Sequence, residues 1–273
     1  MSIELSLNVA ARAWVAPRRA SIGFVRDLLT VARRSLRGAL REPAAVIPAL
    51  IIPIFFFAVN VGSLGSVAGT FSGFNYTAFQ LPVAVIFAVT GVSRANSLVQ
   101  DISSGYFERL LLTPVNRLAL LLGLMAADFL LVVALCIPVL AMGLVVGVSF
   151  ATGVVGMVVF TLLAALWGVA FTGFPYAIAL RTGSPAAVAA SFILFFPFAF
   201  LTTAYVPADA LSGWLATVAT VNPVTYILDG LRSLVISGWD PGRLGGTIIA
   251  TGIVATISIG MALLALRRRV RVA

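Results

Sequence analysis

The sequence of 273 residues contains no histidine and no lysine, and it has one cysteine. Without lysine the chain cannot form a phosphate-binding loop of the G-x-x-x-x-G-K-[ST] type, and without histidine it cannot supply the base of a Ser-His or Cys-His catalytic pair. A structural zinc site needs several Cys or His ligands and is excluded as well. No intrachain disulfide can form, and Cys136, which lies in an apolar run, is interpreted as a small buried hydrophobe.

Charge is also scarce. Charged residues make up 10% of the sequence and hydrophobic residues 61%, with a mean hydropathy of +1.11. Three long runs, residues 43–93, 129–180 and 244–266, carry no charge at all. Because about 20 apolar residues in helical form cross a hydrocarbon core roughly 30 Å thick, each of the first two runs is long enough for two crossings. The composition therefore predicts an integral membrane protein.

The apolar runs predict six transmembrane helices, near residues 44–62, 76–93, 118–147, 153–180, 186–205 and 244–266. We expect no cleavable signal peptide, because the N-terminus has Glu4 and scattered arginines where a signal needs a short basic region and then an apolar core. The predicted fold is an all-α integral membrane protein. It comprises a cytoplasmic N-terminal segment (1–43), a six-helix domain (44–266) and a basic tail (267–273).

The arginines predict the orientation. All 18 basic residues are arginines, and sixteen of them fall in segments that six crossings put on one side of the membrane. Since Lys and Arg are enriched in cytoplasmic segments, both termini are expected in the cytoplasm of a bacterial cell, with the chain in the plasma membrane. The net charge of +9 is then mainly a topology signal. Membrane lipids are the expected partner of the flanking arginines, and a nucleic acid is the weaker interpretation.

The segment before the first crossing has the pattern of an amphipathic helix. Its apolar residues follow a period of 3.6, and arginines occupy the opposite face. The apolar set is Ile22, Val25, Leu29, Ala32, Leu36 and Leu40, and the polar set is Arg26, Thr30, Arg33, Arg37 and Arg41. Such a helix lies in the membrane interface, where it is either a simple surface anchor or also a contact for a cytosolic partner.

Two polar segments carry motifs. The cytoplasmic segment 97–117 contains Gly105, then Glu108-Arg109, an apolar run, Thr113-Pro114 and Arg117. The external segment 206–243 contains Asn222-Pro223-Val224-Thr225-Tyr226 and then Leu231-Arg232. Asn222 is a good N-cap and Pro223 suits the first helical position. The apolar period that follows, with Asp229, Arg232 and Ser233 opposite, predicts a short re-entrant or interfacial helix at the outer side of the membrane.

Together these features resemble the ABC-2 type permeases, the membrane subunits of type V ABC exporters. The resemblance covers nearly the whole chain and is greatest for the daunorubicin-resistance type of drug-exporter permease. It implies two copies of a separate ABC ATPase, and a homodimer or a heterodimer with a related permease. It also implies that ATP and Mg are bound by the partner subunit, with no cofactor in this chain.

The resemblance implies that segment 97–117 contacts the ATPase. Glu108 and Arg109 are expected to form charge-assisted hydrogen bonds across the docking surface, unless they are ordinary solvated loop charges. Apolar side chains would fill a groove on the partner, and Gly105 and Pro114 would shape the ends of a short coupling helix. The apolar candidates are Phe107, Leu110 and Leu111, and Arg117 closes the segment.

The transport pathway leaves fewer signals. Asp128 is the one acidic residue inside a predicted membrane helix. An ionised carboxylate at the bilayer centre costs at least about 2.5 to 3.5 kcal/mol, so Asp128 should face a cavity, a partner helix or the headgroups. Further candidates for the lining of a pathway, as opposed to lipid-facing or core residues, are Phe56, Asn60, Phe196 and Thr202.

The expected function is that of a permease subunit, without its own ATPase site, that moves a hydrophobic or amphipathic compound outward by alternating access. A drug, a lipid or a glycolipid fits this description. A polysaccharide or glycoconjugate exporter of the same family is the alternative. An ion-coupled secondary transporter is poorly equipped, with no His, no Lys and one candidate acid, and an intramembrane enzyme lacks a general base beyond Asp128.

Overall fold

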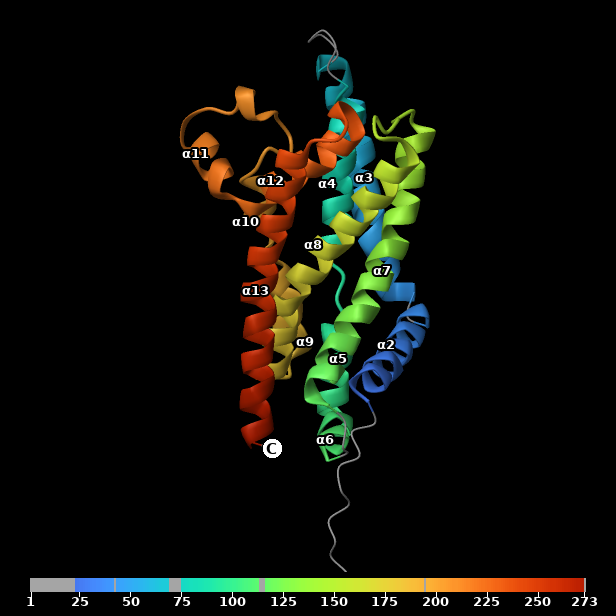
Figure 1. Ribbon diagram of the computed structural model, residues 1–273, viewed down its shortest axis with the longest axis vertical. Helices are drawn as coiled ribbons and strands as arrows, with labels where there is room; N and C mark the ends of the chain where they lie inside the picture. The colour runs from blue at the N-terminus through green and yellow to red at the C-terminus, as the bar shows by residue number, and fades with distance from the viewer. Residues whose placement is uncertain (1–22, 42, 69–74, 113–115, 194, 273) are drawn as a thin grey trace, which may run out of the picture.

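The computed structural model describes residues 23–41, 43–68, 75–112, 116–193 and 195–272, and within these ranges every regular element is a helix (Figure 1). The predicted all-α class is therefore confirmed. The elements are α2 (Phe24–Leu40), α3 (Pro43–Ala68), α4 (Tyr76–Thr90), α5 (Ala95–Ser103), α6 (Tyr106–Leu111), α7 (Arg117–Val145), α8 (Gly153–Thr182), α9 (Pro185–Ile193), α10 (Phe195–Phe200), η1 (Ala208–Ala210), α11 (Gly213–Val221), α12 (Pro223–Arg232), η2 (Ser233–Ser237) and α13 (Pro241–Val272).

Four helical segments of the described residues are long and apolar enough to cross a membrane. They are Tyr76–Ser103, which joins α4 and α5, Arg117–Val145, Gly153–Thr182 and Pro241–Val270. Two shorter apolar segments, Ile47–Ser63 and Pro185–Phe200, are also present. The architecture is thus that of a multi-pass membrane protein, and the number of six crossings stays a prediction.

The predicted helix over residues 186–205 differs most from the structure. The apolar helical segment here, Pro185–Phe200, contains α9 and α10 and ends before the predicted boundary at residue 205. Beyond α10 the Thr202 hydroxyl donates to the carbonyl of Ala199 and accepts from the amide of Ala204. Such local side-chain bonds compete with the helical hydrogen bonds, so the backbone turns at residues 201–206.

Helix α4 lies at the centre of the bundle, against α3, α7, α8 and α12, and nearly all of its side chains are buried. Helix α8 packs along both α7 and α13. Gly173 lets α8 approach α13, because a Cβ atom there would collide with the backbone of Ser258. The Ser258 hydroxyl donates to the carbonyl of Ala170 at the same crossing. Small residues at this contact are typical of helix packing in membranes.

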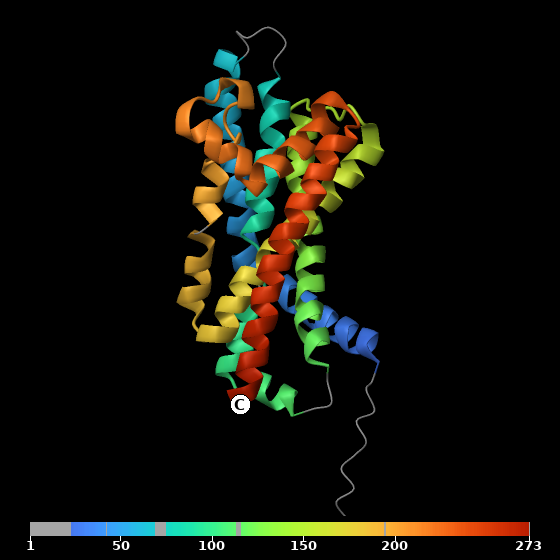
Figure 2. The ribbon, with the colours of Figure 1, turned by 60° about the vertical axis from the view of Figure 1, so that its left-hand side comes forward.

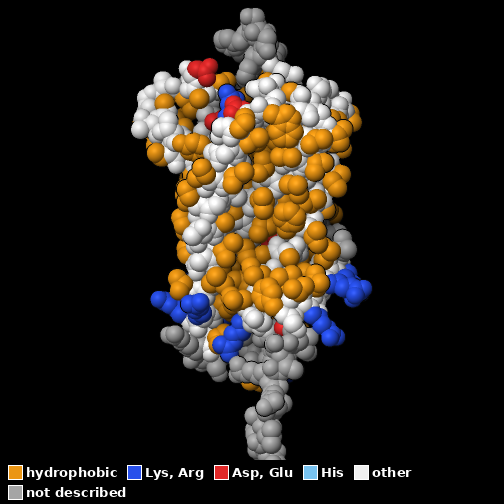
Figure 3. Space-filling model, viewed as in Figure 1, with side chains coloured by type: hydrophobic (Ala, Val, Ile, Leu, Met, Phe, Trp, Pro, Cys, Tyr) orange, Lys and Arg blue, Asp and Glu red, His pale blue; other side chains and the backbone are white. Residues whose placement is uncertain are grey.

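The two ends of the bundle differ in charge. Figure 3 shows a broad apolar belt, with most of the visible arginines around the end where the chain terminates and with acidic side chains and a smaller basic group at the other end. We call these the arginine-rich end and the opposite end. Figures 1 and 2 show α2, α6 and the last turns of α13 at the arginine-rich end, and α10, α11 and α12 at the opposite end. The arginine distribution along the sequence therefore corresponds to one end of the folded chain.

Candidate coupling site

Helices α5 and α6 form an elbow at the arginine-rich end. Gly105 joins them with φ of 69°, in the left-handed region that glycine tolerates, and it is the N-cap residue of α6. The short helix predicted after Gly105 is therefore present. Pro114, expected to shape its other end, lies outside the described residues.

Helix α6 is fixed to the bundle by Phe107. The side chain is 1% exposed and belongs to the same buried cluster as Leu98, Leu121 and Leu124. Phe107 therefore fills a space within this chain, which corrects the expectation that it fills a groove on a partner. Leu110 is half-buried beside the cluster, and the side chain of Leu111 lies outside the described set.

The neighbouring charges of α6 have different surroundings. Glu108 Oε1 accepts a hydrogen bond from Arg269 Nη2 of α13 at 3.2 Å. The Nη1 atom of Arg269 donates to the carbonyl of Leu180 in α8 at 3.1 Å. Arg109 is exposed. Glu108 thus links α6 to α13 within the chain, while Arg109 presents its charge at the surface.

Helix α2 contacts the elbow through Arg34. Its guanidinium donates two hydrogen bonds to the carboxylate of Asp101 in α5, at 3.0 and 2.7 Å. The same guanidinium carbon lies 4.2 Å from the ring centroid of Tyr106 in α6, a cation–π distance. The hydrogen bond to Asp101 raises the pKa of Arg34 above its ordinary value. One arginine therefore connects α2 to both helices of the elbow.

A second contact ties α2 to the start of α7. The carboxylate of Asp27 is buried and accepts a hydrogen bond from the backbone amide of Asn116 at 3.1 Å. Asn116 in turn caps α7, because its side chain accepts from the amide of Leu118. Gly123, which has no Cβ atom, lets α7 pack closely against α2. A Cβ atom at this position would lie 2.8 Å from the carbonyl oxygen of Leu28.

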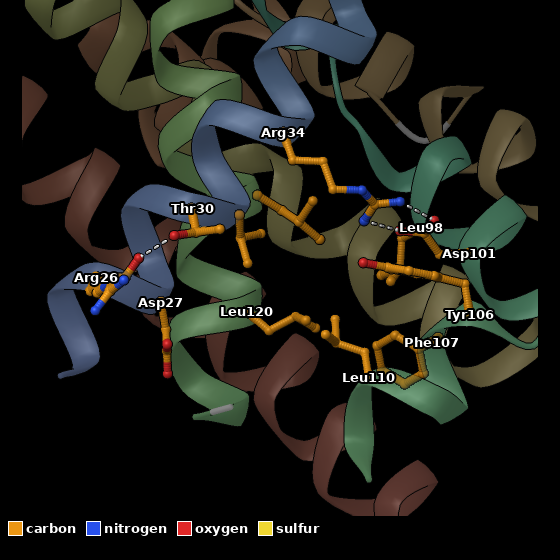
Figure 4. A pocket seen from close by; sticks show the side chains of 12 residues that line it. Arg26, Asp27, Thr30, Arg34, Leu98, Asp101, Tyr106, Phe107, Leu110 and Leu120 are labelled. Carbon is orange, nitrogen blue, oxygen red and sulfur yellow. Dashed lines mark hydrogen bonds and ion pairs between the residues drawn. The ribbon is translucent and has the colours of Figure 1, made fainter. Parts of the chain in front are cut away.

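Between these contacts lies a cavity of about 300 Å³. Figure 4 shows Arg34 reaching across it to Asp101 and Tyr106, with apolar side chains of α5, α6 and α7 around it. The cavity is bounded by the two helices of the elbow, α5 and α6, and by α2 and α7. A displacement of α6 would therefore be transmitted to α2 and α7.

Several residues of this site are not among those predicted from the sequence: Asp27, Arg34, Asp101, Tyr106 and Arg269. One signal was available, since Asp27 and Arg34 are seven residues apart and so lie on one face of a helix.

The arginines predicted for this region are all exposed. Four lie on α2 or directly after it, and one lies at the start of α7: Arg26, Arg33, Arg37, Arg41 and Arg117. Of the predicted apolar face, Val25 and Leu29 are exposed, Ala32 is buried, and Ile22 lies outside the described residues; the interface position of α2 stays a prediction.

Asp128 of α7 is fully buried and uses both carboxylate oxygens. It accepts a hydrogen bond from the backbone amide of Arg94 at 3.0 Å and from the Tyr176 hydroxyl at 2.7 Å. Arg94 is the N-cap residue of α5, so a carboxylate on α7 satisfies the first turn of a helix elsewhere in the sequence. Asp128 therefore holds the break between α4 and α5 against α7 and α8.

The other pathway candidates fall on α3, α10 and the turn after α10. Phe56 and Asn60 face α4 together, in a narrow crevice that also contacts Phe87. The ring of Phe87 makes an edge contact with Phe196 at 6.5 Å between centroids. Thr202 is buried and engaged in the turn described above. The structure thus brings three of the four candidates to neighbouring positions.

The short helix predicted at Asn222 is α12. The side chain of Asn222 accepts from the amide of Val224 at 3.0 Å, and Pro223 occupies the first turn. The amide nitrogen of the Asn222 side chain also donates to the carbonyls of Phe198 and Leu201, which fixes α12 to the end of α10. Tyr226 is exposed and donates to the carbonyl of Thr220.

Arg232 was expected on the polar face of this helix, but it is 6% exposed. Its guanidinium lies 3.5 Å from the ring centroid of Phe79 and donates to the Thr203 hydroxyl at 3.0 Å. Burial lowers the pKa of Arg232 to about 9, so it keeps its proton at neutral pH. Asp229 is partly exposed, 3.9 Å from Arg232. Arg232 therefore packs against α4 instead of facing water, while Asp229 keeps contact with the surface.

In the part of the chain that the structure describes, no three His, Cys, Asp or Glu side chains come close enough to hold a metal ion.

The sequence matches the ABC-2 type transporter family over residues 26–236. It is 26% identical over 245 residues to a probable doxorubicin resistance ABC transporter permease of Mycobacterium tuberculosis, covering 88% of each chain. It is 25% identical over 258 residues to a daunorubicin resistance ABC transporter permease of Streptomyces coeruleorubidus, covering 92% of this chain and 89% of the relative. The chain belongs to the ABC-2 type transporter family, as a permease subunit that lacks an ATPase domain.

Proposed function

We propose that this chain is the permease subunit of an ATP-driven exporter for a hydrophobic or amphipathic compound. ABC permeases pair with ABC ATPase subunits. Two relatives are named for resistance to doxorubicin and daunorubicin, which are amphipathic drugs, and each aligns with most of this chain. A drug or a membrane lipid of similar amphipathic character is therefore the proposed substrate class.

The observation that carries the coupling part of the proposal is the set of contacts around α6. Phe107 ties α6 to the bundle, Glu108 ties it to α13, and Tyr106 lies beside Arg34 of α2. A force applied to α6 by an ATPase subunit would thus reach three other parts of the chain. The exposed charge of Arg109 is available for the ATPase contact itself.

In the proposed complex the arginine-rich end lies in the cytoplasm, with six crossings between the two ends. Two permeases, either two copies of this chain or this chain and a related one, combine with two ATPase subunits. ATP and Mg bind to the ATPase subunits. This orientation is supported by the positive-inside rule, since arginines gather around the end that carries α6.

The proposed pathway follows the face shared by α3, α4 and α10. Phe56 and Phe196 are both half-exposed there, and Asn60 supplies one polar group nearby. Asp128 is proposed to position the α4–α5 break next to this pathway instead of contacting substrate, because both its oxygens accept hydrogen bonds from the chain itself.

The direct test is transport into inside-out vesicles that contain the chain and its ATPase. ATP-dependent uptake of doxorubicin or of a fluorescent phospholipid, abolished when a non-hydrolysable ATP analogue replaces ATP, is the expected result. Uptake that needs no ATP but follows an imposed proton gradient would contradict the proposal and favour an ion-coupled carrier.

A further inference from the structure

A second, larger cavity lies at the opposite end of the bundle, away from the coupling site. It is a groove of about 690 Å³ between α8, α10, α12 and α13. Figure 1 shows α10, α12 and α13 next to one another at this end. The walls are almost entirely apolar, and they include Trp167, Phe171, Val224, Gly246, Ala250 and Ile257.

The groove follows one face of α13. From Gly246 to Ile257 its lining residues recur at helical spacing over eleven residues, which corresponds to roughly 16 Å along a helix axis. A bilayer hydrocarbon core is about 30 Å thick, so the groove is as deep as a single leaflet. Its far end lies near the middle of α13, and its mouth lies beside α12.

Residues that are common at the level of lipid headgroups lie on the segments next to the helices that line the groove. Arg243 stands one turn before Gly246 and is about half-exposed, with its Nε atom 3.2 Å from the carboxylate of Asp240. Trp239, next to Asp240, is 53% exposed, and Trp214 of α11 is 70% exposed. Exposed tryptophans are enriched at the membrane–water boundary, where their rings contact both apolar chains and water.

We infer that this groove binds one hydrocarbon chain of a phospholipid from the leaflet at the opposite end, with the phosphate of that lipid beside Arg243. An apolar space of this volume next to a bilayer leaves its lining side chains without van der Waals partners unless a chain enters it. The apolar walls, the depth of one leaflet and a cation one turn before the first lining residue of α13 all match the same ligand. The site is distinct from the face of α3, α4 and α10 proposed for transport.

Trp167 provides a probe for the groove. It lines the groove but is 2% exposed, so lipids around the outside of the bundle do not contact it freely. The full chain with Trp14→Phe, Trp214→Phe and Trp239→Phe keeps Trp167 as its only tryptophan. This variant is reconstituted into phosphatidylcholine vesicles whose acyl chains carry bromine, which quenches tryptophan fluorescence at close range. Neither ATP nor an ATPase subunit is present, so the result is independent of the proposed transport activity.

We expect strong quenching of Trp167 and loss of most of it when Ala250→Phe fills the groove. Gly252→Phe is the matched control, because Gly252 lies on the same helix, is exposed, and would have no neighbour within 4 Å of an added Cβ atom. This control should leave the quenching unchanged. The smaller Ala250→Leu, expected to give partial loss, serves if the larger substitution prevents folding, and Arg243→Ala should weaken quenching through loss of the phosphate contact.

An unquenched Trp167 would overturn the inference, whether the groove is covered by a second copy of the chain or closed. Quenching that Ala250→Phe and Ala250→Leu both leave intact would overturn it as well, because bromine would then reach Trp167 by another route.

Discussion

Arg34 of α2 and Asp101 of α5, separated by 67 positions in the sequence, form a two-point ion pair with hydrogen bonds of 3.0 and 2.7 Å. The planar guanidinium matches the two carboxylate oxygens, which a lysine at this position would not do. The pair joins α2 to the elbow of α5 and α6. Asp27 and Asn116 make the corresponding link at the start of α7.

Breaking this pair should reduce coupling while the stability of the protein changes little. The Arg34 side chain is 51% exposed, and exposed ion pairs contribute about 0.2–1 kcal/mol, so Arg34→Ala should shift thermal unfolding little. Drug-stimulated ATP hydrolysis by the reconstituted complex should fall several-fold, because α2 no longer follows α6. The charge swap of Arg34→Asp with Asp101→Arg should restore part of the loss. Arg33→Ala, at an exposed neighbouring arginine, is the control, and equal behaviour of the two alanine variants would contradict this role.

The contact between α6 and α13 gives a second prediction. Glu108 Oε1 lies 3.2 Å from Arg269 Nη2, and Glu108→Lys replaces this attraction by repulsion between two positive charges. We expect the protein to fold and transport-coupled ATP hydrolysis to drop several-fold. Combining Glu108→Arg with Arg269→Glu should recover activity, whereas Arg268→Glu, at the exposed neighbour, should have little effect. Unchanged coupling in Glu108→Lys would contradict a role of this contact in coupling.

Asp128 is predicted to act mainly on stability. Asp128→Ala leaves the Arg94 amide and the Tyr176 hydroxyl without their present acceptor, and each unpaired buried donor costs about 1–3 kcal/mol. Thermal unfolding in detergent should therefore occur at a much lower temperature. Because Tyr176→Phe removes one of these donors, the double variant should lose less than the sum of the two single losses. Asp209→Ala, at an exposed acid, is the neutral control, and strictly additive losses would contradict the shared hydrogen bond.

The orientation can be tested by labelling single cysteines in a Cys136→Ala background. Ser212 and Ser104 are both exposed and lie at opposite ends of the bundle. In intact cells a membrane-impermeant thiol reagent should label Ser212→Cys and should reach Ser104→Cys only after the cells are opened. The reversed pattern would invert the proposed topology.

Much of the fold follows from local sequence patterns. The uncharged runs predict the long helices, because length and hydropathy alone determine what can cross a bilayer. Asn222 and Pro223 predict the start of α12 through their own backbone preferences, and Gly105 predicts the turn into α6. The end of α10 at Phe200 was missed, since mostly apolar residues continue beyond it to Val206.

The coupling site depends on contacts that no local pattern contains. Phe107 and Arg109 are both on the six-residue α6, and the sequence cannot tell which of them faces the bundle. Arg232 has the pattern of a surface residue on an amphipathic helix. Inside the protein, however, its guanidinium lies over the aromatic ring of Phe79 and donates hydrogen bonds to nearby carbonyls. The partners of Arg34 and Glu108 lie far away in the chain, so their pairing requires the tertiary structure.

Crosslinking in the native membrane can show whether α6 is the contact for an ATPase subunit. A photo-crosslinking amino acid is introduced in place of Arg109, and in a separate variant in place of Arg181, which is exposed at the same end but on α8. We expect a covalent adduct with an ABC ATPase from position 109, with a yield that changes when ATP is added, and little or none from position 181. No adduct from position 109, or equal adducts from both positions, would contradict it.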